Sequence, residues 1–255
     1  MDLPQTPRGI GLAALLLAAS CVFNAAPAQA QDAIGLAGVE ARYQALGQGG
    51  AGEASRQPLL LEVDLGASPG YSLTYDSAAG MLEVRYAMAF NQLTEGWSWQ
   101  PGANPEVEDY YRFKFLPLGS RPETRGEYQG EDKIGEPEKM RVEWRYDYFL
   151  AFDNLYDFYP RVVDDEAGFV ARIAASPEQA AQWQAPGRLR LLALAHLTSP
   201  YVAESTTFWK ADHAQPRDFT LKKRYLVGVL DEIRFQDAGS GAVLARVSPQ
   251  RPGKP

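Results

Sequence analysis

The feature that most constrains the fold is the stretch RVEWRYDYFLAFDNLYDFYPRVVDDE, residues 141–166. Every even position from Val142 to Phe152 is apolar or aromatic, whereas the first odd positions are charged, namely Arg141, Glu143, Arg145 and Asp147. Successive side chains of a β-strand point to opposite faces, so a period of two marks a strand. The pattern predicts a long strand with one buried face and one largely wet face. Its aromatic residues belong first of all to the core.

The same period of two recurs along the chain, at residues 59–65, 71–75 and 82–90. The short SAAG segment at residues 77–80 ends in a glycine that can take positive φ, which predicts a hairpin over residues 71–90. Further predicted strands cover residues 110–116, 188–197, 219–235 and 242–247.

Helical signals are few. Residues 34–46 place Leu36, Val39, Tyr43 and Leu46 at helical spacing, and Ser176 followed by Pro177 suits the start of a helix over residues 177–184. The sequence therefore predicts a mainly β fold, an antiparallel β-sandwich or open barrel with about two short helices.

The N-terminus predicts export. Arg8 precedes an apolar run over residues 9–23, and Ala28-Gln29-Ala30 is a small-x-small cleavage signature. The run is 15 residues long, and a helix that spans a bilayer needs roughly 20. We expect residues 1–30 to be a cleaved signal peptide, with no integral membrane segment afterwards and a periplasmic or secreted product. Acylation of Cys21 as a lipoprotein is the alternative, and we favour release.

Cys21 is the only cysteine, so a chain that begins at Gln31 has no disulfide. We expect a helix plus flexible linker at residues 31–57, a single β-rich domain at residues 58–247 and a disordered tail at residues 248–255. Packing has to hold the domain together.

Composition and motifs argue against several ligand classes. Asp and Glu outnumber Lys and Arg by 32 to 25, a net charge of −7, and no basic patch is evident, which excludes nucleic acid. Two separated histidines and no thiol argue against zinc. The acidic residues 153–166 lack the ligand spacing of a calcium loop, and no phosphate-binding motif is present, so we expect no metal and no cofactor.

Catalytic signals are weak. His196 ends an apolar strand and His213 lies in a polar connection, and neither adjoins a nucleophile motif. Paired carboxylates of a glycosidase have no sequence signature, so a carbohydrate-active or other hydrolase stays an alternative. We assign no catalytic residue and favour a non-enzymatic role.

Two segments are candidate binding elements. Residues 117–139, PLGSRPETRGEYQGEDKIGEPEK, read as a long charged loop, which is either a mobile spacer or a binding loop. The segment TEGWSWQPGANP carries two indoles on one side, either buried or exposed for stacking. Assuming that both segments lie at one end of the scaffold, the predicted ligand-binding residues are Trp97, Trp99, Glu127, Tyr128, Glu131, Asp132 and Lys133.

Together these observations predict an exported, non-enzymatic envelope protein that binds a protein or an envelope component through loops of a β scaffold. An outer-membrane β-barrel is a third hypothesis, which the charged loop and the Pro255 terminus weaken.

Overall fold

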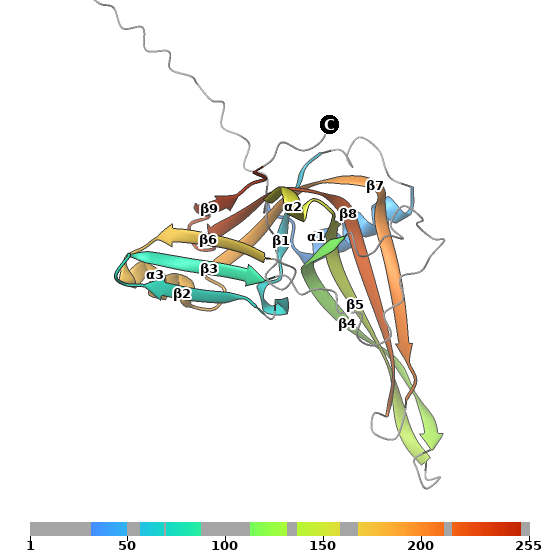
Figure 1. Cartoon of the computed structure of the whole chain (residues 1–255). Helices are drawn as coiled ribbons and strands as arrows, with labels where there is room; N and C mark the ends of the chain where they lie inside the picture. The colour runs from blue at the N-terminus through green and yellow to red at the C-terminus, as the bar shows by residue number, and fades with distance from the viewer. Residues whose placement is uncertain are drawn as a thin grey trace, which may run out of the picture. The chain divides into compact units, whose positions relative to one another are not determined.

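A computed structural model describes residues 32–49, 57–68, 70–87, 113–131, 137–158, 168–211 and 216–250 (Figure 1). This part of the chain is mainly β with two helices of seven or more residues, which confirms the predicted fold class, and its sheets are not closed into a barrel. The predicted signal peptide, residues 50–56 of the predicted linker and the last five residues lie outside the described part.

The larger sheet has six strands among the described residues. Five follow the order β1 (Leu59–Val63), β7 (Leu189–Trp209), β8 (Arg217–Asp237), β5 (Pro137–Phe152) and β4 (Lys114–Glu131), and β9 (Val243–Val247) pairs with β8. All pairs are antiparallel except β5 with β8. Strands β4–β5 and β7–β8 pair as antiparallel hairpins, and the second strands of the two hairpins, β5 and β8, run parallel side by side.

The smaller sheet is antiparallel, in the order β2 (Ser72–Asp76), β3 (Met81–Ala87) and β6 (Gly168–Ala174). The predicted hairpin is present as β2–β3, and Gly80 in its turn has φ 63°. Buried Leu82 and Ile173 from this sheet share one core with Leu191 and Phe235 from the larger one. The two sheets are therefore packed together through side chains of both.

Three helices of the described part complete this core, of which the shortest, α2 (Leu155–Phe158), contributes buried Leu155 and Phe158. In α3 (Pro177–Gln184), which has the predicted bounds, Ser176 caps the first turn and Trp183 is buried. In α1 (Leu36–Gly47), Val39 and Leu46 are buried. The ring of Tyr43 meets that of Tyr148 edge-on at 6.1 Å between centroids, so α1 lies against one face of the larger sheet, here called the helix face.

The alternation of β5 is only partly as predicted. On the helix face Tyr146, Tyr148, Leu150 and Phe152 are buried, whereas Val142 and Trp144 are only half-buried. The prediction of a largely wet opposite face is wrong towards the end of the strand, where Asp147 and Ala151 are also buried. The reason is a second apolar cluster on that side, the far face, made by Phe113, Phe115, Ala151, Ala203, Tyr225 and Val227 with Phe149.

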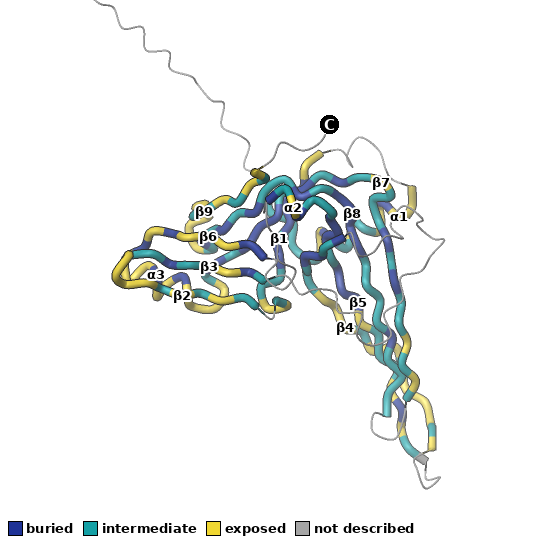
Figure 2. The backbone as a smooth tube through the Cα atoms, viewed as in Figure 1, coloured by how far each residue is buried: buried dark blue, intermediate teal, exposed yellow. Residues whose placement is uncertain are grey.

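The predicted long loop at residues 117–139 is wrong as well. Strands β4 and β5 pair from Lys114 with Phe152 to Glu131 with Pro137, and the register shifts between Pro117 and Gly119 and again between Thr124 and Gly126. Much of β4 beyond residue 120 is exposed (Figure 2). An exposed edge strand needs no alternating apolar residues and tolerates proline, glycine and bulges, which hides it in the sequence. Residues 132–136 are outside the described part.

Candidate functional site

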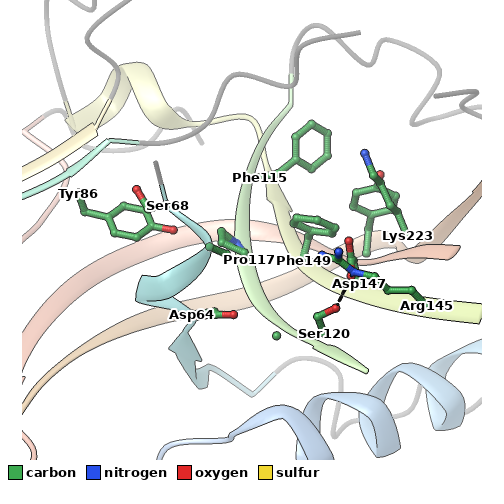
Figure 3. Close-up of a pocket in the computed structure, with 13 residues that line it drawn as sticks. Asp64, Ser68, Tyr86, Phe115, Pro117, Ser120, Arg145, Asp147, Phe149 and Lys223 are labelled. Atoms are coloured by element: carbon green, nitrogen blue, oxygen red, sulfur yellow. Dashed lines mark hydrogen bonds and ion pairs between the residues drawn. The ribbon is translucent and has the colours of Figure 1, made fainter. Parts of the chain in front are cut away.

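A cavity of about 290 Å³ lies along the edge strand β4 (Figure 3). Its described lining comes from β3, β4, β5 and β8 and from the segment around the short 3-10 helix η2 (Leu65–Ala67). Pockets for small molecules measure roughly 300–1,000 Å³. The cavity is at the lower end of that range.

The polar end of the cavity is organised around the carboxylate of Asp147, whose residue is only 8% exposed. Ser120 Oγ donates a hydrogen bond to Asp147 Oδ1 at 2.5 Å, and Arg145 Nε donates to the same oxygen at 2.7 Å. Arg145 Nε is also 2.9 Å from Ser120 Oγ. The three side chains hold one another in place, as the close-up shows (Figure 3).

Lys223 lines the cavity from the neighbouring strand, where residue 223 of β8 is in register with Asp147 of β5. Burial lowers the pKa of Lys223 from 10.5 to about 8, with the charge of Asp147 opposing this shift and that of Arg145 adding to it. A substantial fraction of this amine is therefore neutral near pH 8.

The middle of the cavity has an aromatic wall on the far face. The rings of Phe149 and Tyr225 stack at 5.6 Å between centroids with 25° between their planes. Phe115 contacts Tyr225 at 5.2 Å and Phe149 at 6.4 Å. Tyr225 is buried and Phe149 only half-buried, so Phe149 presents accessible apolar surface beside the charged end.

Tyr86 and Ser68 line the opposite end (Figure 3). Ser68 Oγ donates to the carbonyl of Ala87 at 2.6 Å, which ties the segment around η2 to β3. The backbone N–H of Asp64 donates to the carbonyl of Pro117 at 2.8 Å, which ties it to β4. Burial, with a smaller contribution from Asp64, raises the pKa of Tyr86, so its phenol stays neutral.

A β-bulge in β4 builds the polar end. Phe115 and Pro117 face the cavity at odd positions, but the register shift between Pro117 and Gly119 adds one residue, so the even position 120 faces it too. Without that residue Ser120 would point to the helix face and could not reach Asp147. Gly119 makes the bulge possible with φ 137°, a region that side chains rarely adopt.

The predicted ligand-binding residues lie elsewhere or outside the described part. Glu127, Tyr128 and Glu131 are on the outer half of β4, where Glu127 forms an ion pair with Lys139 of β5, and Tyr128 is 39% exposed. None of these three lines the cavity. Trp97, Trp99, Asp132 and Lys133 are outside the described residues, so their binding role stays a prediction.

Arg145, Asp147 and Lys223 were not predicted from the sequence as a group. A signal was present in KKR at residues 222–224, three cations inside a predicted strand, because a period of two separates the middle one from its neighbours. The pattern does not indicate that β5 is the strand beside β8.

Two further polar pairs lie outside the cavity in the described part of the chain. His196 Nδ1 lies 2.9 Å from Asp231 Oδ1, where Asp231 is the extra residue of a bulge opposite β7. Asn154 exchanges two hydrogen bonds with the backbone of Leu230, at 2.8 and 3.0 Å, and so serves the fold. Among the described residues no group of three or more His, Cys, Asp and Glu could hold a metal ion.

Comparison of the chain with models of protein families, with curated proteins and with solved structures gives no match. In the described part, no helix combines the length and the apolar character needed to cross a membrane.

Proposed function

We propose that this chain is an exported, non-enzymatic protein of the cell envelope, periplasmic or secreted, that binds a small amphiphilic envelope component in the cavity beside β4. The observation that carries the proposal is the meeting of two kinds of surface in one cavity. Arg145 and Lys223 supply cationic groups at one end, and Phe149 supplies accessible apolar surface next to them.

The arrangement of the polar groups supports binding. Asp147 already accepts hydrogen bonds from Ser120 and Arg145, so its carboxylate is engaged in holding those two side chains. A few fixed polar groups against an apolar wall are typical of sites that orient a ligand. Because the N-terminus predicts export, we expect the protein to encounter this ligand in the periplasm or outside the cell.

The test is to purify the protein from its native envelope, extract it with organic solvent and identify bound small molecules by mass spectrometry. Ala67 lines the cavity and is exposed, so Ala67→Trp should fill space there without disturbing the core. Ala78→Trp, at an exposed position in the β2–β3 turn, is the matched control.

We expect one compound to accompany the unaltered protein and Ala78→Trp and to be depleted from Ala67→Trp. The proposal is overturned if the unaltered protein carries no compound, or if the two tryptophan variants carry it equally.

A further inference from the structure

A second cavity, of about 520 Å³, adjoins the cavity beside β4. Its described lining comes from the start of α1, the end of β1, η2, β2, β4 and the turn between α3 and β7. The two cavities share two lining residues, Asp64 and Gly119. Their common wall is made by β4 and the segment around η2, which the hydrogen bond from the backbone N–H of Asp64 to the carbonyl of Pro117 joins. The two cavities therefore lie on opposite sides of one thin wall.

Gly119 is the point at which this wall carries no side chain. A Cβ at Gly119 would meet Leu36 Cδ1 at 3.1 Å, so the side chain of Leu36 lies directly over this residue. Leu36 itself lines the second cavity. A chain that leaves the aromatic wall of the first cavity at Gly119 therefore meets an aliphatic surface next.

The apolar lining of the second cavity is mainly aliphatic, whereas that of the first is mainly aromatic. The aliphatic side chains come from five different parts of the fold and are those of Leu36, Val63, Leu65, Leu73, Leu118 and Leu189. Burial of apolar surface is favourable in proportion to its area and has no preferred direction. Such a lining suits a flexible hydrocarbon chain.

The polar groups of the second cavity are engaged with one another. Arg190 Nε and Nη2 donate to Glu62 Oε1 and Oε2 at 2.9 and 2.8 Å, a bidentate pair. Asp64 Oδ1 accepts from the backbone N–H of Gly66 at 3.0 Å, and Gln184 Nε2 donates to the carbonyl of Leu73 at 3.4 Å. A polar head group would have to compete with these contacts. An apolar body would not.

The volumes set the length of a ligand that uses both cavities. At roughly 30 Å³ for each heavy atom, the volume share of one liquid water, about 290 Å³ holds about ten heavy atoms and about 520 Å³ holds about 17. A ligand confined to the first cavity is short. One that fills both has the size of a single-chain lipid.

We propose that the ligand is a single-chain lipid, whose polar head and first carbons occupy the cavity beside β4 and whose aliphatic tail passes Gly119 into the second cavity. This inference rests on the proposed function, since it assumes that the first cavity is a binding site, and it adds the chemical class of the ligand. It specifies the tail and is independent of the charge of the head.

The experiment is isothermal titration calorimetry with four neutral alcohols of increasing chain length, hexanol, octanol, decanol and dodecanol. The protein is purified from its native host, and its bound compounds are removed on a hydrophobic resin. Ala67→Trp fills the first cavity. Ala185→Trp fills the second, where Ala185 is an exposed lining residue. Ala181→Trp is the matched control, because Ala181 is exposed on α3 and lines neither cavity.

We expect the affinity of the unaltered protein to rise from hexanol through octanol to dodecanol. The increase should reach about 4-fold for each added methylene, which corresponds to about 0.8 kcal/mol for each buried CH₂. In Ala185→Trp the gain beyond octanol should be lost, while hexanol and octanol bind as before. Ala67→Trp should weaken every probe, and Ala181→Trp should behave as the unaltered protein does.

The possible failures are distinguishable. If affinity stops rising at octanol and Ala185→Trp changes nothing, while Ala67→Trp weakens binding, the first cavity is a site but the tail does not enter the second. If Ala185→Trp weakens hexanol as much as dodecanol, the second cavity binds by itself and the inference is also overturned. If Ala67→Trp leaves every probe unchanged, or no probe binds the folded protein, both proposals are overturned. Circular dichroism checks folding, and Ala67→Phe or Ala185→Phe replaces a tryptophan variant that does not fold.

Discussion

Asp147 and Lys223 occupy register positions directly opposite each other on the parallel strands β5 and β8. The carboxylate of Asp147 accepts hydrogen bonds from Ser120 and Arg145, and the charges of Asp147 and Arg145 act on Lys223 in opposite directions. The pKa of Lys223 and the stability of the fold are coupled through this arrangement.

The stability of the protein should rise between about pH 8 and pH 10. The unfolded chain keeps the Lys223 proton up to its ordinary pKa of 10.5, whereas the folded chain loses it near pH 8, so the unfolded state binds more protons in this window. After solvent screening the gain is on the order of 1–2 kcal/mol. Above about pH 10 the half-buried Tyr43 and the buried Tyr86, whose pKa values burial raises, reverse the trend.

Urea unfolding at pH 7.5 and pH 9.5 measures this difference, with Lys223→Met as the control that should lose it. An unaltered pH dependence in Lys223→Met would assign the effect to other groups.

Substitutions at the two β5 neighbours should move the pKa of Lys223 in opposite directions. Asp147→Asn removes a charge that raises this pKa, and Arg145→Gln removes one that lowers it. We expect Asp147→Asn to lower the pKa of Lys223 and Arg145→Gln to raise it. Titration of the lysine ε-methylene carbon by NMR measures both, and shifts of the same sign would contradict the geometry.

The loss in the free energy of unfolding caused by a buried aspartate on β5 should depend on which residue is replaced. Leu150 is fully buried in the main core, so Leu150→Asp should destabilise the domain by about 3–5 kcal/mol. Tyr146 is also buried, but the guanidinium of Arg224 lies 4.4 Å from its ring centroid and that of Arg121 at 5.2 Å. Tyr146→Asp should therefore destabilise the domain less than Leu150→Asp does. Denaturant titration of both variants measures this difference. Equal losses would show that these arginines do not compensate the new carboxylate.

The bulge that orients Ser120 depends on Gly119. A Cβ at this position would meet Leu36 Cδ1 at 3.1 Å, and φ is 137°. Gly119→Ala should cost about 1–3 kcal/mol and weaken ligand binding, because relief of the strain turns Ser120 away from Asp147. Gly126, in the second bulge of the same strand, has open space around it, so Gly126→Ala is the matched control in thermal denaturation. Similar melting temperatures for the two variants would contradict this account.

Cleavage of the signal peptide should leave Gln31 at the N-terminus, because the small-x-small signature ends at Ala30. Intact-mass spectrometry of protein from the native host measures this directly. A lipid-modified Cys21 would instead place the protein on a membrane surface and contradict release.

Much of the local structure could be predicted because its causes are local. The alternation in β5, the glycine turn between β2 and β3, and the cap at Ser176 each depend on residues a few positions apart. The outer half of β4 could not be recognised in this way, since an exposed edge strand places no demand on apolar spacing and its bulges interrupt the period. Pairing with β5 decides which residues of β4 face each side of the sheet.

The candidate site was decided by tertiary structure. Arg145, Asp147 and Lys223 are visible in the sequence as charged residues within strands, but no local pattern states that β8 lies beside β5. That pairing brings the lysine against the carboxylate, and the bulge at Gly119 adds Ser120 from a third strand. The sequence by itself determined the alternation of β5, the turn of the β2–β3 hairpin and the cap at Ser176, because each follows from nearest-neighbour geometry. In contrast, β6 and the outer parts of β4 and β7 were not predicted. The burial that shifts the pKa of Lys223 comes from the pairing of strands distant in the chain, which only the folded protein supplies.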